Sequence, residues 1–137
     1  MQTTKIIFTN GCFDILHRGH YELLKYCSSL GRVIVGLNSD SSVSDLKGPS
    51  RPFFKQEDRI FALKSCRYVD EVIVFNENTP YNLIKSISPD IIVKGGDYIA
   101  EQVVGNDLAE VKIFNFVEGY STTKILENND IRRDTLY

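Results

Sequence analysis

KIIFTNGCFDILHRGHYELL, residues 5–24, is the stretch that decides the fold. It opens with a short apolar run, Ile6 to Phe8, which is too brief for a helix and predicts a buried strand. Asn10-Gly11 is expected to break that strand, because glycine accepts backbone angles that other residues resist. Apolar residues then recur at helical spacing from Tyr21 to Cys27, so a helix is predicted to begin within residues 16–19.

Two histidines and an aspartate lie between the predicted strand and the predicted helix. His17 and His20 are three residues apart on the first helical turn and therefore share a face. The N–H groups of that turn have no partner within the helix, and the helix dipole is positive there, so anions are favoured. With close backbone at Gly11 and Gly19, these groups predict a phosphate cradle. Two other interpretations stay open: a metal pair completed by Asp14, and solvated side chains without a role.

The composition is that of an ordinary globular chain with a small negative charge. With 137 residues, of which 42% are hydrophobic, the chain is expected to form a single domain over residues 1–137 with a sizeable core. The net charge of −2 argues against a nucleic-acid partner, which usually requires a basic face. Three scattered cysteines without a Cys-x-x-Cys pair predict free thiols and a cytoplasmic setting. We expect no signal peptide and no membrane partner, because no apolar run approaches ~20 residues.

Strands and helices alternate along the rest of the chain. This alternation predicts an α/β fold with helices on a five-stranded, mainly parallel sheet. Ligands of such sheets lie beyond the carboxyl ends of the strands, where residues 9–14 and 38–40 meet. Further strands are expected over residues 32–38, 69–75, 90–98 and 112–117. Helices are expected over 56–66, from Pro80 to Pro89 with Thr79 as the N-cap, and over 121–126. Residues 130–137 are expected to form a loose tail.

Two polar segments at this edge carry candidate site residues. Residues 39–54 are interpreted as a loop over the ligand edge, and two explanations of it are open. It is a solvated connection, or it brings the cations Lys47 and Arg51 to an anion site. Lys94 and Asp97 flank a glycine turn after the fourth strand, and their alternative role is a surface ion pair.

Two helix starts carry further signals. Arg59 stands early in a helix, on its more polar face, where a cation opposes the dipole, so we expect an anionic partner for it. That partner is Glu57, Asp58, another carboxylate or the substrate. Three hydroxyl residues, 121–123, follow a glycine turn at the last helix, and capping by Ser121 alone does not explain all three.

His17-Arg-Gly-His20, after a strand and Gly-Cys-Phe-Asp, resembles the His-x-Gly-His signature of the nucleotidyltransferase superfamily. This resemblance implies that the α/β fold is a Rossmann-like three-layer sandwich. Over residues 5–126 the chain is similar to adenylyltransferases of D-glycero-β-D-manno-heptose 1-phosphate. Glycerol-3-phosphate cytidylyltransferases are the second candidate, although they usually have an arginine before Glu-Gly, where this chain has Asn115-Phe-Val117. A nucleotide-binding module without turnover is the third. The matching motifs are Asn10–Asp14, Asn38–Asp40, Leu46–Gly48 with Arg51-Pro52, Val93–Tyr98 and Gly119–Thr123.

The resemblance implies a reaction in which a sugar 1-phosphate oxygen attacks the α-phosphorus of ATP in line and pyrophosphate leaves. Mg²⁺ would offset the triphosphate charge, held by phosphates and water, and we expect no permanent metal site. The implied partners are a nucleoside triphosphate and a sugar phosphate, and the implied assembly is a homodimer or larger. The implied catalytic residues are His17, His20 and Lys47. The implied nucleotide-binding residues are Thr9, Asn10, Gly11, Cys12, Phe13, His17, His20, Lys47, Gly95, Asp97, Ser121, Thr122 and Thr123. The expected substrate-binding residues are Asp14, Arg51, Arg59 and Lys94.

Overall fold

The computed structural model describes residues 4–96 and 98–115. This part of the chain forms a five-stranded sheet in the order β3-β2-β1-β4-β5, and every strand pair is parallel. The elements are β1 (Ile6–Gly11), α1 (Arg18–Leu30), β2 (Arg32–Asn38), α2 (Asp40–Lys47), α3 (Gln56–Lys64), β3 (Glu71–Phe75), α4 (Tyr81–Ile87), β4 (Ile91–Gly95), the 3₁₀ turn η1 (Ala100–Gln102) and β5 (Glu110–Phe114).

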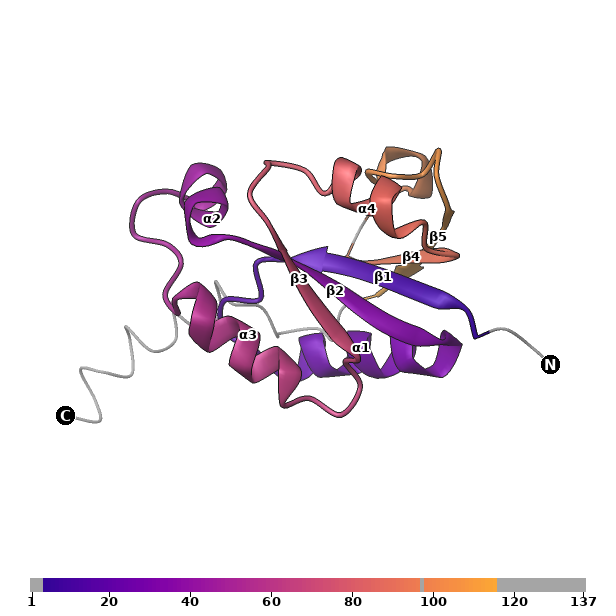
Figure 1. The fold of residues 1–137 in the computed structure, drawn as a ribbon, viewed down its shortest axis with the longest axis horizontal. Coiled ribbons are helices and arrows are strands. Elements are labelled where there is room, and N and C mark those ends of the chain that lie inside the picture. The colour runs from indigo at the N-terminus through magenta and orange to yellow at the C-terminus, as the bar shows by residue number, and fades with distance from the viewer. Residues whose placement is uncertain (1–3, 97, 116–137) are drawn as a thin grey trace.

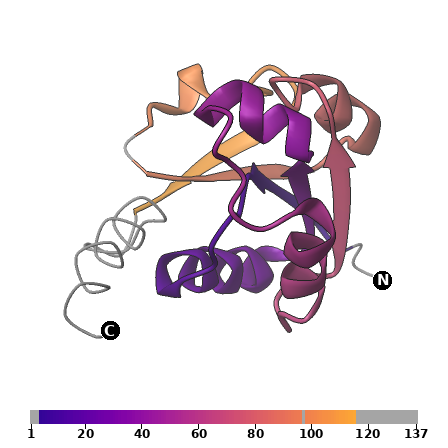
Figure 2. The same cartoon turned by 90° about the vertical axis from the view of Figure 1, so that its left-hand side faces the viewer.

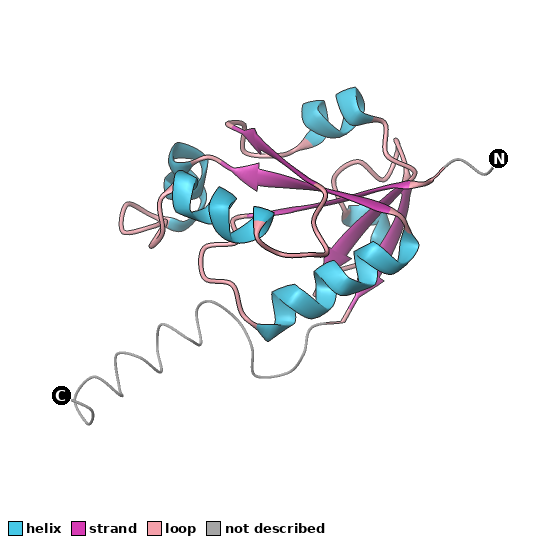
Figure 3. Ribbon diagram, turned by 60° about the horizontal axis from the view of Figure 1, so that its bottom comes forward, coloured by secondary structure: helices cyan, strands magenta, loops and turns pink. Residues whose placement is uncertain are grey.

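Helices cover both faces of the sheet. Figure 1 shows α1 and α3 below the sheet and α2 and α4 above it, and the turned view in Figure 2 shows the same three layers. The chain moves outward from β1 to β3 and then returns to β4 on the other side of β1 (Figure 3). The predicted α/β three-layer sandwich is therefore confirmed. No helix in the described part of the chain is long and apolar enough to cross a bilayer.

The core consists of two apolar clusters, one on each face of the sheet. Ile7 and Phe8 are adjacent in β1 and belong to different clusters, because successive side chains of a strand point to opposite faces. Ile7 shares its cluster with Leu24 of α1, whereas Phe8 shares its cluster with Ile84 of α4. The buried strands thus hold both helix layers in place and fix the loops at the carboxyl edge.

Two predicted boundaries are wrong. Asn10-Gly11 does not break β1, because these two residues continue the ladder opposite Gly36 and Leu37 of β2. Thr79 does not cap α4, since Pro80 occupies the N-cap position and the helix has no side-chain cap. The carboxyl ends of β1 and β2 are consequently in register at the edge where the ligand is expected.

The segment predicted as a loop over residues 39–54 contains a helix, α2. The Ser39 side chain accepts a hydrogen bond from the Ser42 N–H at 3.2 Å and caps that helix. Ser42 and Val43 are completely buried, so packing against β2 adds to the cap. Because α2 ends at Lys47, this candidate cation stands on a helix end and not within an extended loop.

Candidate active site

The two histidines cap α1 through a reciprocal pair of hydrogen bonds. Nδ1 of His17, the N-cap residue, accepts from the Gly19 N–H at 3.0 Å. Nδ1 of His20 accepts from the His17 N–H at 3.3 Å, and the two ring centroids are 3.9 Å apart. Because Nδ1 is the acceptor in both rings, the proton of each neutral imidazole is on Nε2. Both rings therefore carry a hydrogen-bond donor of the kind that an anion accepts from.

Both imidazoles are neutral at physiological pH. Burial lowers the pKa of His17, and burial together with the neighbouring His17 ring and the Lys47 cation lowers the pKa of His20 to about 3. The Phe13 ring lies against His20, with the centroids 5.4 Å apart, and contributes to that burial. The pair can thus donate hydrogen bonds to phosphate oxygens without carrying charge of its own.

Two adjacent hollows open at the carboxyl edge of the sheet. The smaller has a volume of about 180 Å³ and is lined by Phe13, His20 and Gly95 among others. The larger has a volume of about 420 Å³ and extends toward α4 and η1. Most of the predicted nucleotide-binding residues that the structure describes are thus brought together. The wall common to both hollows is made by Asn10, Gly11, Cys12, Lys47, Lys94 and Tyr98.

The shared wall carries two cations and one thiol. The Lys94 Nζ lies 5.2 Å from the centroid of the Tyr98 ring, and burial lowers the pKa of this lysine. Burial raises the pKa of Cys12 although Lys47 and the nearby arginines oppose the rise, so its sulfur is a thiol at neutral pH. The wall therefore suits an anionic ligand, and burial disfavours the nucleophilic thiolate form of Cys12.

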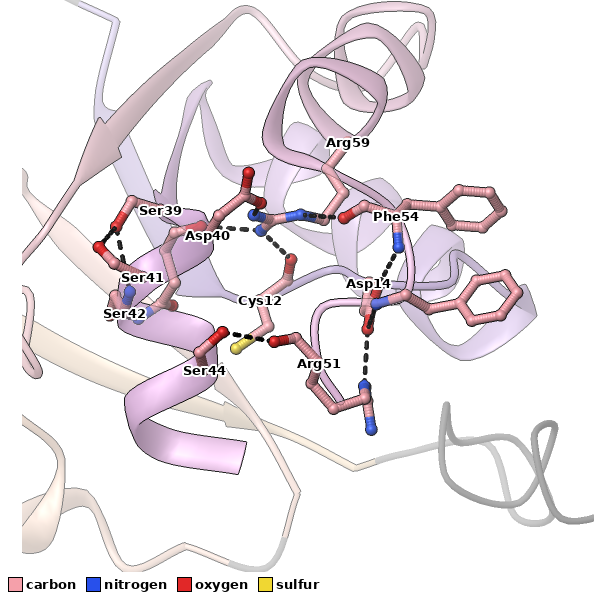
Figure 4. Close-up of polar contacts among 12 residues, drawn as sticks. Cys12, Asp14, Ser39, Asp40, Ser41, Ser42, Ser44, Arg51, Phe54 and Arg59 are labelled. Atoms are coloured by element: carbon pink, nitrogen blue, oxygen red, sulfur yellow. Dashed lines mark hydrogen bonds and ion pairs between the residues drawn. The ribbon is translucent and has the colours of Figure 1, made fainter. Parts of the chain in front are cut away.

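Asp14 fastens the segment after α2 to the segment after β1 (Figure 4). Its Oδ2 accepts from Arg51 Nε and from the Phe53 N–H, both at 2.7 Å, and its Oδ1 accepts from the Phe54 N–H at 2.8 Å. Burial by itself would raise the pKa of Asp14, but the hydrogen bonds from these three donors outweigh it and hold the pKa below its usual value. The carboxylate stays ionised and keeps the two segments together.

Arg59 joins three separate segments at one guanidinium (Figure 4). Its Nε donates to the Phe54 carbonyl at 2.9 Å, and its Nη1 donates to the carbonyls of Cys12 at 2.9 Å and Asn38 at 2.7 Å. Nη2 donates to Asp40 Oδ1 at 2.8 Å. The anionic partner expected for Arg59 is thus another carboxylate, and the predicted polar face proves to be buried.

The structure shows contacts within the protein for Asp14 and Arg59, and their expected contacts with the substrate stay a prediction. Their side chains are only 1% and 0% exposed, and their polar atoms bind the protein itself. Both residues therefore shape the site through contacts within the protein, although Asp14 also lines the smaller hollow. Arg51 differs from Asp14 and Arg59 in its hydrogen bonding, because its Nη2 is buried and has no hydrogen-bond partner among the described residues.

Other predicted site residues have mixed outcomes. Thr9 is buried within β1, and His17 caps α1 beside the smaller hollow without lining it. Asp97 and the hydroxyl residues 121–123 lie outside the described residues. Asp14 does not join the two histidines in a metal site, since no group of three potential ligands occurs in the described ranges.

The sequence analysis missed three polar residues that line the larger hollow. Asn78 and Thr79 follow β3, and Gln102 belongs to η1. The rule that ligands lie beyond the carboxyl ends of parallel strands could have identified Asn78 and Thr79, because β3 ends just before them. No local signal points to Gln102.

Comparisons with known proteins agree with this geometry. A family model described as cytidylyltransferase-like matches residues 8–129. Over 125 residues, or 90% of this chain, the chain is 57% identical to the bifunctional protein HldE of a Nitratiruptor species and 52% identical to that of Helicobacter pylori. The match covers 27% of each relative, so the chain spans about a quarter of the length of these curated proteins.

Solved structures show the same fold. A lipopolysaccharide core biosynthesis protein from Thermoplasma volcanium has a TM-score of 0.70 and 26% identity, over 87% of this chain and 100% of that one. Pantothenate synthetase from Thermus thermophilus has a TM-score of 0.65 and 16% identity, over 95% of this chain and 64% of that one, and shares the fold. With a family model that matches most of its length, this chain belongs to the cytidylyltransferase-like family.

Proposed function

We propose that the chain transfers an adenylyl group from ATP to D-glycero-β-D-manno-heptose 1-phosphate and releases pyrophosphate. The observation that carries this proposal is the neutral His20 imidazole, whose proton is on Nε2 and which lines the smaller hollow together with Lys47 and Lys94, next to the His17 ring. These groups suit the oxygens of a polyphosphate. The sequence motifs that resemble the heptose 1-phosphate adenylyltransferases supply the choice of nucleotide and sugar.

The chemistry requires no strong base. The phosphate of the acceptor is already an anion at neutral pH, its oxygen attacks the α-phosphorus, and the bond to the leaving pyrophosphate breaks. His17 and His20 donate hydrogen bonds to phosphate oxygens, and Lys47 stabilises the charge that develops on the leaving group. When bound, Mg²⁺ would neutralise part of the triphosphate charge, with phosphates and water as its main ligands.

The relatives support the setting of this reaction. The Thermoplasma volcanium protein is named for lipopolysaccharide core biosynthesis, and we propose the same destination for the nucleotide-activated heptose. A cytoplasmic setting fits the three free cysteines and the need for ATP. The motif resemblance also implies a homodimer or larger assembly, which analytical ultracentrifugation of the purified chain tests.

The decisive experiment measures pyrophosphate release from ATP, CTP and GTP, each with heptose 1-phosphate or glycerol 3-phosphate, in the presence of Mg²⁺. We expect turnover only with ATP and heptose 1-phosphate. Turnover with CTP and glycerol 3-phosphate would keep the mechanism and replace the substrates. Nucleotide binding without pyrophosphate release from any pair would favour a binding module and refute the enzyme proposal.

The imidazoles are tested separately. His17→Ala and His20→Ala should each lower turnover by ~10²-fold or more, the scale for loss of one charge-stabilising donor. Circular dichroism would check that the fold persists, since loss of an N-cap costs about 1 kcal/mol. Near-normal turnover in both variants would refute their assignment.

A further inference from the structure

The larger hollow differs in character from the smaller one. Its far end is lined by uncharged hydrogen-bonding side chains, Asn78, Thr79 and Gln102, with apolar side chains of Val103 and Val104 beside them. The described residues that line it include no aspartate or glutamate. None of the three polar side chains has a hydrogen bond to another residue in the described part of the chain. This end of the hollow therefore offers free donors and acceptors without net charge.

The direction of in-line attack separates the two hollows by role. The attacking oxygen and the leaving group stand on opposite sides of the α-phosphorus. If the pyrophosphate leaves next to His20, in the smaller hollow, the nucleophile approaches from the larger one. Lys47 and Lys94, on the common wall, then lie where the two sets of phosphates meet.

The dimensions and chemistry of the larger hollow fit a phosphorylated sugar. Its volume of about 420 Å³ is within the range of small-molecule sites. An amide side chain can both donate to and accept from hydroxyl groups, and a threonine hydroxyl can do the same. Valine side chains suit the C–H faces of a sugar ring. A molecule with a phosphate at one end and several hydroxyls at the other matches this arrangement from the lysines outward.

We propose that Asn78, Thr79 and Gln102 form the subsite that binds the hydroxyl groups of the acceptor sugar and thereby determines which sugar phosphate reacts. This inference rests on the proposed function, because it assumes that the acceptor of the nucleotidyl group is a sugar phosphate. Asn78, Thr79 and Gln102 are exposed in the free protein, so discrimination depends on their desolvation by the bound acceptor. An acceptor that covers the amides without offering hydroxyls leaves them unpaired, which costs binding free energy.

The test uses substitutions that keep volume and remove hydrogen bonding: Asn78→Leu, Thr79→Val and Gln102→Met. Each should raise the KM for heptose 1-phosphate about fivefold, the scale for one lost hydrogen bond, and the triple variant about a hundredfold. The KM for ATP should stay within about twofold of the wild-type value. Asn82→Leu is the matched control, because Asn82 is exposed on α4 and lines a separate surface depression.

Two readouts distinguish this inference from the reaction itself. The first is the ratio of kcat/KM for heptose 1-phosphate to that for glycerol 3-phosphate, which should fall in the three variants and not in the control. The second is calorimetric binding of heptose 1-phosphate without ATP, which should weaken in the same variants. If the wild-type protein binds heptose 1-phosphate without turnover and the three variants bind it more weakly, the proposed reaction is refuted and the proposed subsite stands.

Three results would overturn the subsite. Unchanged KM values for the acceptor in all three variants, with normal wild-type turnover, would leave the function standing without it. A rise in the KM for ATP in place of the acceptor would show that the larger hollow holds the nucleoside. Wild-type protein that binds no heptose 1-phosphate by calorimetry and does not turn it over would also contradict it.

Discussion

Replacing His20 by glutamine should remove much of the acid sensitivity of folding. In the wild-type protein, His20 Nδ1 accepts a hydrogen bond from the His17 N–H, and burial lowers the pKa of His20 to about 3. Glutamine at the third helical position accepts the same hydrogen bond in ordinary capping boxes. His20→Gln therefore keeps the cap and removes only the titrating group.

The magnitude follows from the pKa difference between the folded and unfolded states. The ordinary pKa of histidine is 6.5, and the folded value of about 3 lies below it. A base whose folded pKa is lowered stabilises the fold above the unfolded pKa, and this contribution is lost as the pH falls from 6.5 toward 3. At pH 4.5 the unfolded chain binds a proton that the folded chain does not. Between pH 7 and pH 4.5 this costs about 2.5 kcal/mol of unfolding free energy.

Urea unfolding followed by circular dichroism measures the effect. The free energy of unfolding is determined for wild type and His20→Gln at pH 7 and pH 4.5, and the two losses are subtracted. Contributions of all other titrating groups cancel in that difference, because both proteins contain them. If wild type and His20→Gln lose the same unfolding free energy within about 0.5 kcal/mol, burial does not lower the pKa of His20. The assignment of His20 as a neutral hydrogen-bond donor would then be refuted as well. The imidazole C–H signals provide a second check: in NMR spectra of the free protein, His20 should not titrate between pH 5 and pH 8.

Further predictions concern Lys47, the buried carboxylate of Asp14, and Gly105, which has a positive φ. Lys47→Ala should lower turnover by ~10²-fold in the pyrophosphate assay with little change in Tm, because the side chain is exposed; an unchanged rate would leave the end of α2 as a solvated connection. Asp14→Asn should reduce the urea unfolding free energy by about 3–5 kcal/mol, since it leaves Arg51 without its carboxylate, whereas Asp45→Asn at an exposed position should change it by less than about 0.5 kcal/mol. Equal effects of the two would contradict the assigned contacts. Gly105→Ala should lower stability by about 1–3 kcal/mol in thermal unfolding, because φ is +91° and a Cβ would come within 2.8 and 2.9 Å of two isoleucine side chains; an unchanged Tm would show that the neighbours move aside freely.

The parts of the structure that local sequence signals specify could be predicted. The first strand, the helix that begins after His17 and the parallel sheet follow from short apolar runs, helical spacing and alternation of elements. The same signals place His20, Gly11 and Gly19 at the carboxyl edge of the sheet. Local chemistry was sufficient here because the residues involved are close in the sequence.

α2 could not be recognised from periodicity. Its eight residues include only two apolar ones, Val43 and Leu46, and Leu46 is exposed. The helix is stabilised by the Ser39 cap and by the burial of small polar residues, which the hydrophobic pattern does not record. The local signals available were at the ends of the helix: the Ser39 cap with Asp40 in the first turn, and Lys47 followed by Gly48 at the C-terminus.

The roles of Asp14 and Arg59 depend on contacts that no local pattern encodes. The donors to Asp14 come from residues 37 to 40 positions later, and Arg59 reaches Cys12 across 47 positions. Sequence reasoning named both as expected substrate-binding residues because they are charged and near a predicted anion site, although for Arg59 it also allowed another carboxylate as the partner, which is what the structure shows. Only the folded chain shows that their charges are used within the protein.

Three of the four acceptors of Arg59 are main-chain carbonyls. A bond to a carbonyl does not depend on which side chain the same residue carries. Positions 12 and 54 can therefore exchange side chains while the loop geometry is retained, whereas Asn38 is also held through its buried side chain, which donates to Ser42. A single arginine thus separates the shape of the binding edge from its chemical specificity, which gives related chains room to accept different substrates on one framework.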